Sequence, residues 1–165
     1  MSEKLPGITF QDADDAEVIR LLEPITEVWR AIGDADISDT SGHGDFDADG
    51  IGKDKSWQEY LVSILDSDWQ KVTERLDRSL LNRLAEEFAS VLPSCPEERR
   101  LVHGDFGSNN LLVDKGRVTG ALDWADARYG DPLLDIAGAY FWRTWLMCTA
   151  KSAEYWDERL AATPD

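Results

Sequence analysis

The sequence has few cysteines, few basic residues and no long apolar run. Its 165 residues include two cysteines, which cannot form a disulfide framework and fit a reducing compartment. No apolar stretch approaches the roughly 20 residues that a spanning helix needs, and the first residues lack the basic and apolar segments of a secretory signal. We therefore expect a soluble, cytoplasmic protein without a membrane partner.

Positive charge is scarce, because 17 lysines and arginines stand against 33 aspartates and glutamates, which gives a net charge of −16. Such a surface repels polyanions, so nucleic acid is not an expected partner. The acidity has two interpretations: a solvated surface that keeps the protein soluble, or attraction of a cationic small molecule. Hydrophobic residues make up 42% of the chain, so we expect one globular domain over residues 1–165.

The apolar pattern predicts a mostly helical α+β protein with a small β-hairpin. Residues 12–32 have helical spacing, and Pro24 within them predicts a kink or the start of a new helix. Residues 33–55 are rich in glycine and aspartate and predict a long loop.

Helical signals return at Ser56, which forms a capping box with Glu59. Ser67 is a candidate cap for a second, longer helix that ends before Pro93. An apolar stripe along this helix predicts a buried face. The stripe consists of Trp69, Val72, Leu76, Leu80, Leu84, Phe88 and Val91.

Short strands are predicted at residues 101–102 and 111–113, and another at residues 118–124. The residues 114–116, Asp-Lys-Gly, form a turn signal between the last two strands, which therefore make a hairpin. Helical spacing resumes after residues 130–132.

The stretch that carries chemistry is HGDFGSNN, residues 103–110. Asp105 and Asn110 have the spacing of a kinase catalytic loop, H-x-D-x-x-x-x-N. Phosphoryl transfer needs a carboxylate at the attacking hydroxyl and oxygen ligands that hold Mg²⁺ against the phosphates. The hairpin would bring Asp123 back beside the loop as a second, anionic metal ligand. The alternative is a plain turn rich in Asp, Asn and Gly, but the hairpin with its second aspartate favours the functional interpretation.

The segment that contains these residues resembles the catalytic core of the aminoglycoside phosphotransferase family. Its sequence is VHGDFGSNNLLVDKGRVTGALDWADARYGDPLLDIA. The segments DISDTSGHG, GIGKDKSW and FWRTWLMC are similar to members that act on hygromycin-like aminoglycosides. The likeness runs from about Leu5 to about Asp157. It implies the C-lobe of a protein-kinase-like fold, ATP as co-substrate and Mg²⁺ as the metal.

The resemblance also implies roles for single residues. Asp105 matches the catalytic aspartate that accepts or orients the proton of the substrate hydroxyl. Asn110 and Asp123 match the two Mg²⁺ ligands. The loop is supported by the motif histidine and by the G-D-P-x-x-D segment, which place His103, Asp131 and Asp135 in this role.

Substrate binding is expected of residues near the loop and on the last predicted helix: Asn109, Asp126, Trp142 and Trp145. Trp142 and Trp145 are three residues apart and share a helix face, so core packing is the alternative for both. For Asp126, the alternatives are contact with an ammonium group of the substrate or a solvated turn.

Members of the family carry an N-terminal lobe with a strand lysine that grips the ATP phosphates, and in this sequence Lys4 stands alone. We therefore expect this N-lobe to be absent and expect either the missing lobe or self-association to cover the apolar surface left behind. The predicted function is ATP- and Mg²⁺-dependent phosphorylation of a hydroxyl on a hygromycin B-like aminoglycoside, which gives antibiotic resistance. The alternatives are a kinase of another small hydroxylated amine or sugar, and a non-catalytic C-lobe that only binds aminoglycoside.

Overall fold

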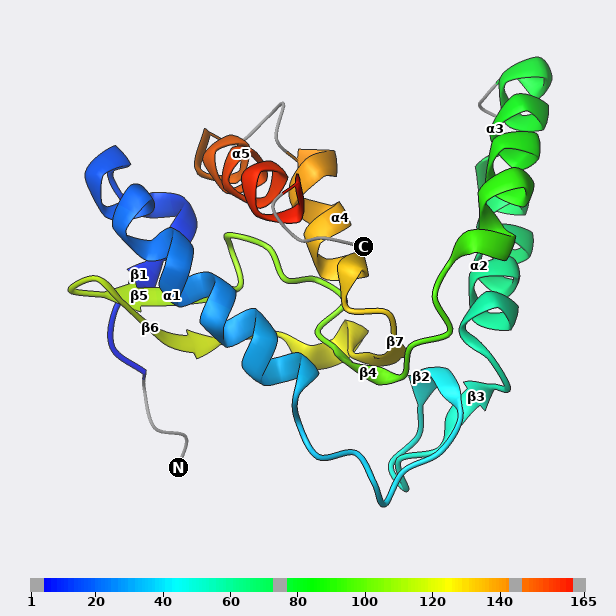
Figure 1. The fold of residues 1–165 in the computed structure, drawn as a ribbon, viewed down its shortest axis with the longest axis horizontal. Helices are drawn as coiled ribbons and strands as arrows, with labels where there is room; N and C mark the ends of the chain where they lie inside the picture. Colours follow the sequence, from blue (N-terminus) through cyan, green and yellow to red (C-terminus); the bar gives the residue numbers. More distant parts are fainter. Residues whose placement is uncertain (1–4, 73–76, 143–146, 162–165) are drawn as a thin grey trace. The chain divides into compact units, whose positions relative to one another are not determined.

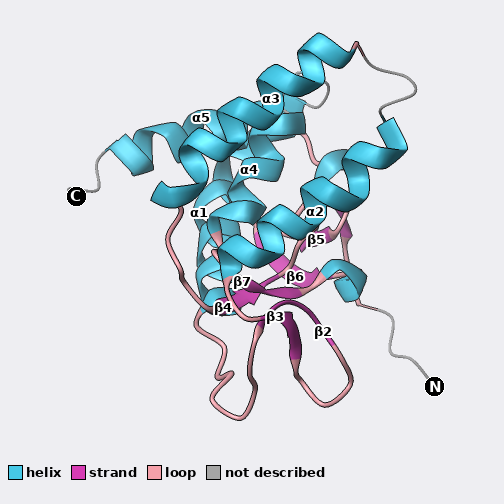
Figure 2. Cartoon of the chain, turned by 90° about the vertical axis from the view of Figure 1, so that its right-hand side faces the viewer, coloured by secondary structure: helices cyan, strands magenta, loops and turns pink. Residues whose placement is uncertain are grey.

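A computed structural model of the protein describes residues 5–72, 77–142 and 147–161. Helices form most of the regular structure and the strands are short (Figure 2), which confirms the predicted α+β class. The elements are β1 (Ile8–Thr9), η1 (Phe10–Asp12), α1 (Asp15–Gly33), β2 (His43–Phe46), β3 (Gly52–Asp54), α2 (Trp57–Val72), α3 (Arg78–Val91), η2 (Leu92–Ser94), β4 (Arg100–Val102), β5 (Leu111–Asp114), β6 (Arg117–Ala121), η3 (Trp124–Asp126), β7 (Arg128–Gly130), α4 (Leu133–Trp142) and α5 (Met147–Ala161).

The chain divides into two compact units. The first contains Met1–Ala35, Leu101–Ala127 and Pro132–Asp165, and the second contains Asp36–Arg100 and Arg128–Asp131. Each unit is therefore built from segments that lie far apart in the sequence.

The first unit is built on an antiparallel sheet in the order β1-β5-β6, which α1 contacts, while α5 contacts both α1 and α4 (Figure 1). Apolar residues of α1 recur every three or four positions and face this sheet. Full burial of one such side chain contributes about 1.5–3 kcal/mol. The core cluster consists of Phe10, Val18, Leu21, Ile25, Leu111 and Val113.

The helix α1 continues through Pro24, so the expectation of a new helix start at that residue is wrong. Proline has no N–H and removes one helical hydrogen bond. The apolar residues on either side, Leu21 and Ile25, are 0% and 4% exposed, and their burial outweighs the lost bond. At the N-terminus, the Asp14 side chain accepts the N–H of Glu17 at 2.8 Å and caps the helix.

The predicted hairpin is confirmed as β5 and β6, which pair from Leu111 and Ala121 to Asp114 and Arg117. The two turn residues both have positive φ, Lys115 at 51° and Gly116 at 73°. This conformation matches the right-handed twist of the strands that it joins.

The second unit contains an antiparallel sheet in which β2 lies between β3 and β7. The prediction of one long loop over residues 33–55 is therefore wrong. The glycines that suggested a loop are required by the close approach of β2 and β3, because a Cβ at Gly42 would lie 2.3 Å from the carbonyl oxygen of Gly52.

Arg99 holds the segment before β2. Its Nε donates to the carbonyl of Gly42 at 2.6 Å, and its Nη2 donates to Thr40 Oγ1 at 2.5 Å. The guanidinium also lies over the Tyr129 ring, 4.6 Å from the ring centroid. A single side chain distant in sequence thus orders a stretch that has little apolar content of its own.

The helix α2 begins where the capping box predicts. Glu59 N–H donates to Ser56 Oγ at 3.0 Å, and the Glu59 carboxylate accepts the N–H of Lys55 at 2.9 Å. The Glu97 carboxylate accepts two further N–H groups of the first turn, from Trp57 at 2.8 Å and Gln58 at 3.2 Å.

Ser67 lies inside α2 and not at a helix start, so its predicted capping role is wrong. The next described helix, α3, begins at Arg78 with Asp77 as its cap. Asp77 caps α3 instead, because its carboxylate accepts the N–H groups of Ser79 and Leu80, while Ser67 lies within the continuous helix Trp57–Val72.

The predicted apolar stripe is only partly buried. Leu84 is 39% exposed and Val91 is 55% exposed, whereas Leu81, next to the predicted position Leu80, is 7% exposed. The side chains of Trp69, Val72 and Leu76 lie outside the described residues. Across the described ranges, every helix is too short or too polar to cross a membrane.

Replacing Asp77 by alanine is expected to weaken α3 at neutral pH. The Asp77 carboxylate bonds to the Ser79 hydroxyl and accepts the N–H groups of Ser79 and Leu80, and these bonds lower the pKa of the carboxyl below its ordinary 3.8. A lowered folded-state pKa means that the stabilisation is present above the unfolded-state pKa and is lost as pH falls through the folded-state pKa.

Circular dichroism melts of the wild type and Asp77→Ala should therefore differ at pH 7 and converge in strong acid. Asp39→Ala, at an exposed aspartate of a loop, is the matched control and should melt like the wild type at both pH values. A difference that persists unchanged in acid would contradict the capping role.

Candidate active site

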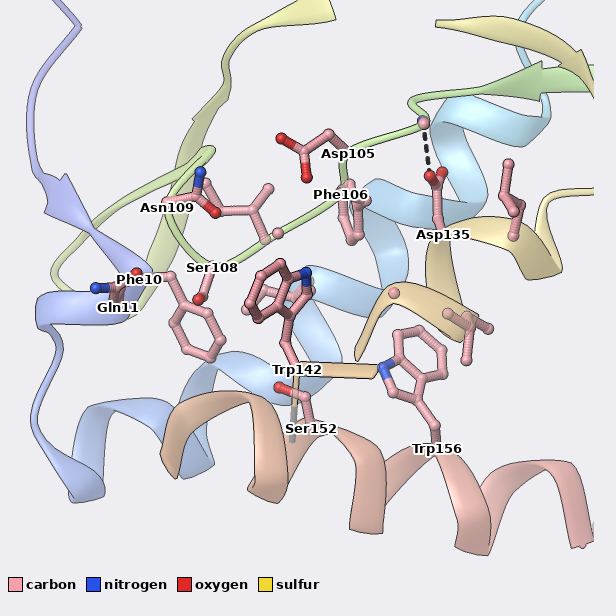
Figure 3. Close-up of a pocket in the computed structure, with 17 residues that line it drawn as sticks. Phe10, Gln11, Asp105, Phe106, Ser108, Asn109, Asp135, Trp142, Ser152 and Trp156 are labelled. Atoms are coloured by element: carbon pink, nitrogen blue, oxygen red, sulfur yellow. Dashed lines mark hydrogen bonds between the residues drawn. The ribbon is translucent and has the colours of Figure 1, made fainter. Parts of the chain in front are cut away.

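The candidate catalytic loop, residues 103–110, connects β4 to β5 and is held at its start by Asp135 of α4. Asp135 Oδ2 accepts the N–H of His103 at 3.0 Å. Asp135 Oδ1 accepts the N–H of Gly104 at 2.8 Å, which is the dashed line at Asp135 in Figure 3. The Asp135 residue is only 4% exposed. A buried carboxylate with two backbone donors is fixed in orientation, so α4 determines where the loop begins.

His103 joins the loop to the segment before Asp123. The residue is 1% exposed, its Nε2 lies 2.9 Å from the carbonyl oxygen of Leu122, and its Nδ1 accepts the N–H of Asp105 at 3.3 Å. A neutral imidazole with its proton on Nε2 satisfies both contacts. The role of His103 as a support of the loop stays a prediction.

Asp105, Asn109 and Asn110 form a chain of side-chain hydrogen bonds. Asn110 Nδ2 donates to Asp105 Oδ2 at 2.7 Å and to the Asp105 carbonyl at 2.9 Å, and Asn109 Nδ2 donates to Asn110 Oδ1 at 3.2 Å. Asp105 and Asn109 are exposed, while Asn110 is 7% exposed. The loop is tight here, since a Cβ at Gly107 would lie 2.6 Å from Asn109 Oδ1.

The β5–β6 hairpin brings the backbone next to Asp123 into contact with the end of the loop. The N–H of Leu122 donates to the carbonyl of Asn110 at 2.8 Å, so the backbone of Asp123 directly follows a residue that is bonded to Asn110. Asp123 is exposed and has a left-handed backbone, with φ 58° and ψ 74°. The structure thus brings the backbones of the two predicted metal ligands together.

The donor set at this point fits Mg²⁺, which prefers oxygen ligands. Asn110 directs its Nδ2 to Asp105, so its Oδ1 points away from Asp105. Asp123 adds an exposed carboxylate. Nowhere in the described ranges do three His, Cys, Asp or Glu side chains group closely enough to hold a metal on their own. Two protein oxygens suit an ion whose remaining ligands are phosphates and water.

A cavity of about 470 Å³ lies beside the loop in the first unit. Figure 3 shows Asp105 and Asn109 on one side of it, with Trp142 and Trp156 on the other. Its floor is apolar, and the exposed groups at its edge are polar or aromatic. Buried apolar side chains that line the floor are Phe10, Ile25, Leu111, Ile136 and Trp156.

The remaining predicted site residues are Trp142, Asp126, Trp145 and Asp131. Trp142 lines the cavity and is 47% exposed, which argues against simple core packing. Asp126 is exposed at the end of η3, and Trp145 lies outside the described residues. Asp131 is buried in the second unit, so its role as a loop support stays a prediction.

Sequence reasoning missed several residues that line the cavity from outside the loop. Gln11 comes from η1, and Ser152 and Trp156 come from α5. The helical spacing of α5 could have predicted that Trp156 is buried, but no local pattern connects these positions with a loop forty or more residues away.

The site combines a loop that carries an aspartate and an asparagine five residues apart, a second aspartate after the next hairpin and an adjoining cavity. This arrangement is typical of kinase-like phosphotransferases. The sequence model of the Phosphotransferase enzyme family (APH) matches residues 2–163. The chain belongs to this family, which confirms the family predicted from the catalytic-loop segment.

The chain is 38% identical over 170 residues to the hygromycin-B 4-O-kinase of Escherichia coli, with 99% of this chain and 50% of that relative covered. It superimposes with a TM-score of 0.87 and 40% identity on a thermostable mutant of aminoglycoside phosphotransferase APH(4)-Ia in a ternary complex with AMP-PNP and hygromycin B, covering 98% of this chain and 56% of that one. A macrolide 2'-phosphotransferase from Brachybacterium faecium shares the fold at 17% identity and a TM-score of 0.55, with 92% of this chain and 52% of that one covered.

The chain thus spans about half the length of the relatives that it matches. The match to APH(4)-Ia confirms the kinase-like α+β fold. Three of the solved APH(4)-Ia structures carry alanine in place of an aspartate, or of one of two consecutive asparagines that follow it by four and five positions. Asp105, Asn109 and Asn110 have the same spacing in this chain.

Proposed function

We propose that this chain carries the catalytic loop and the acceptor site of a phosphotransferase that moves a phosphoryl group from ATP to a hydroxyl of a hygromycin B-like aminoglycoside. The observation that carries the proposal is the hydrogen-bonded pair of Asp105 and Asn110 at the edge of the cavity. The likeness to the hygromycin-B 4-O-kinase supports the choice of acceptor.

In this proposal Asp105 receives or orients the proton of the acceptor hydroxyl. Its carboxylate is exposed at the cavity and is oriented by Asn110, while its backbone N–H is held by His103. Phosphoryl transfer depends mainly on positioning and charge stabilisation, so a fixed carboxylate is the contribution that the chain itself has to make.

Asn110 and Asp123 would hold Mg²⁺, and ATP would supply the phosphate oxygens that complete its coordination. When bound, the ion neutralises charge on the phosphates. The APH(4)-Ia complexes with AMP-PNP or ADP support a nucleotide as co-substrate.

The cavity would take the acceptor, with Trp142 as an apolar surface for a sugar ring, Asn109 as a polar contact and Asp126 as a partner for an ammonium group. Trp145 is proposed for the same role from the sequence. The net charge of −16 favours the approach of a cation. The resistance that follows from modification of the antibiotic is part of the same proposal.

Two alternatives remain from the sequence: a kinase of another small hydroxylated amine or sugar, and a chain that binds aminoglycoside without transferring phosphate. The second follows from the expectation that the N-lobe with its phosphate-gripping lysine is absent, and that absence stays a prediction.

The test is calorimetric titration of the purified chain with hygromycin B at low and high salt, together with an assay of ADP release from ATP and Mg²⁺. We expect weak, salt-sensitive binding, because attraction between exposed charges is screened over about 8–10 Å at ordinary ionic strength. Asp126→Asn should weaken binding more than the matched control Asp39→Asn in a loop of the second unit.

The two measurements separate the alternatives. Binding with ADP release that depends on added hygromycin B means that these residues transfer phosphate to the acceptor by themselves. Binding without release supports the non-catalytic alternative. If hygromycin B does not bind at low salt, the proposed acceptor is wrong, and other hydroxylated amines become the next ligands to titrate.

A further inference from the structure

The indole of Trp29 on α1 is bonded to the residue that precedes α4. Its Nε1–H donates to the carbonyl oxygen of Pro132 at 3.1 Å, across 103 positions of the sequence. The chain comes from the segment Arg128–Asp131 of the second unit and re-enters the first unit at Pro132. The bond therefore joins α1 to the point of the first unit from which α4 starts.

A ring contact accompanies this bond. The rings of Trp29 and Trp156 meet edge to face, with their centroids 5.3 Å apart and 71° between their planes. Pairs with this geometry add to the stabilisation that the burial of the two rings gives. Trp29 is half-buried, and Trp156 on α5 is 6% exposed. One side chain of α1 thus contacts both the start of α4 and the side of α5.

The carbonyl of Pro132 connects Trp29 with the catalytic loop through two further steps. The N–H of Asp135 donates to the same carbonyl at 3.1 Å, in the first turn of α4. The Asp135 carboxylate in turn accepts the N–H groups of His103 and Gly104. All five residues belong to the first unit. A series of hydrogen bonds therefore runs from α1 to the start of the loop.

We propose that Trp29 is a positioning residue for the catalytic loop: its indole N–H holds the carbonyl of Pro132 and with it the first turn of α4, where Asp135 binds the start of the loop. The proposal rests on the proposed function, since it takes Asp105 as the group that acts on the acceptor hydroxyl. A misplacement of about 1 Å at the reacting groups can slow a reaction about 10²-fold, so a bond far from the substrate can affect the rate.

The alternative is that Trp29 contributes packing alone. Trp29→Phe separates the two roles, because phenylalanine keeps an aromatic ring beside Trp156 but has no N–H for Pro132. Packing alone predicts an effect on the whole first unit, whereas a positioning role predicts an effect concentrated at the start of the loop. Trp57→Phe is the matched control, because Trp57 stacks on Tyr60 in the second unit.

Amide hydrogen exchange distinguishes the two roles without any ligand. In Trp29→Phe the N–H groups of His103 and Gly104 should exchange about fivefold faster than in the wild type, the effect of losing one hydrogen bond of ordinary strength. The N–H groups of the β5–β6 hairpin, in the same unit, should change much less. Trp57→Phe should leave the ratio of loop to hairpin exchange at its wild-type value. Equal acceleration of the loop and the hairpin in Trp29→Phe would overturn the proposal, and so would unchanged exchange at the loop.

The functional part is measured as ADP release that depends on added hygromycin B, together with the calorimetric Kd of hygromycin B. Trp29→Phe should lower kcat about fivefold or more with little change in the Kd, because the loop is displaced while the groups that bind the acceptor remain. Trp57→Phe should release ADP at the wild-type rate. An unchanged kcat in Trp29→Phe would contradict the positioning role. If the wild-type chain releases no ADP, the transfer step of the proposed function fails for this chain, and the exchange measurement alone decides whether Trp29 holds the loop.

Discussion

Asp105→Asn is expected to slow phosphoryl transfer by about 10²-fold or more, with little change in the affinity for hygromycin B. Asparagine keeps the shape of the side chain and an oxygen that can accept the N–H of Asn110, which lies 2.7 Å from Asp105 Oδ2. The variant loses the negative charge that attracts the proton of the acceptor hydroxyl. The loop therefore stays folded while its chemistry fails.

The rate should be measured as ADP release, both by this chain and by a chimera in which the chain replaces the matching half of the hygromycin-B 4-O-kinase. Asp39→Asn in a loop of the second unit is the matched control and should transfer at the wild-type rate. Near-normal transfer by Asp105→Asn would end the assignment of Asp105 as the catalytic carboxylate.

Asp135→Ala is expected to have the largest effect on stability. The substitution leaves the buried N–H of His103 and the part-buried N–H of Gly104 without the carboxylate that accepts them. An unpaired buried group costs about 1–3 kcal/mol and a part-buried group costs less, so the free energy of unfolding should fall by about 3 kcal/mol. For a chain of this length the melting temperature should fall by roughly 10 °C.

Thermal melts and urea titrations of Asp135→Ala and Asp39→Ala check this expectation. The control removes an exposed aspartate and should change stability by less than about 0.5 kcal/mol. A wild-type melting temperature for Asp135→Ala would mean that the start of the catalytic loop is held by other contacts.

The parts of the fold that the sequence predicted are those with local causes. The β5–β6 hairpin follows from a two-residue turn, and the start of α2 follows from the Ser56 and Glu59 box. The loop of residues 103–110 follows from its motif spacing. In each case the residues that determine the structure lie within about a dozen positions of one another.

The parts that the sequence did not predict depend on distant partners. The strands β2 and β3 contain few apolar residues, and the segment before them is held by Arg99, nearly sixty positions away. The cavity is lined by Gln11 and Trp156, which no spacing connects with Asp105. The left-handed backbone of Asp123 and the contact between the His103 and Trp124 rings are likewise visible only in the folded chain.

The cap that Glu97 provides at the start of α2 affects when the chain can fold during translation. The first N–H groups of this helix bond to a carboxylate that is translated forty residues later. The strand β7, which belongs to the same unit, is translated later still. The first unit in turn needs α5 to cover α1. Domains commonly fold one after another from the N-terminus as the nascent chain emerges. Here neither unit can complete its contacts until its last segment has been translated, so we expect both units to finish folding late.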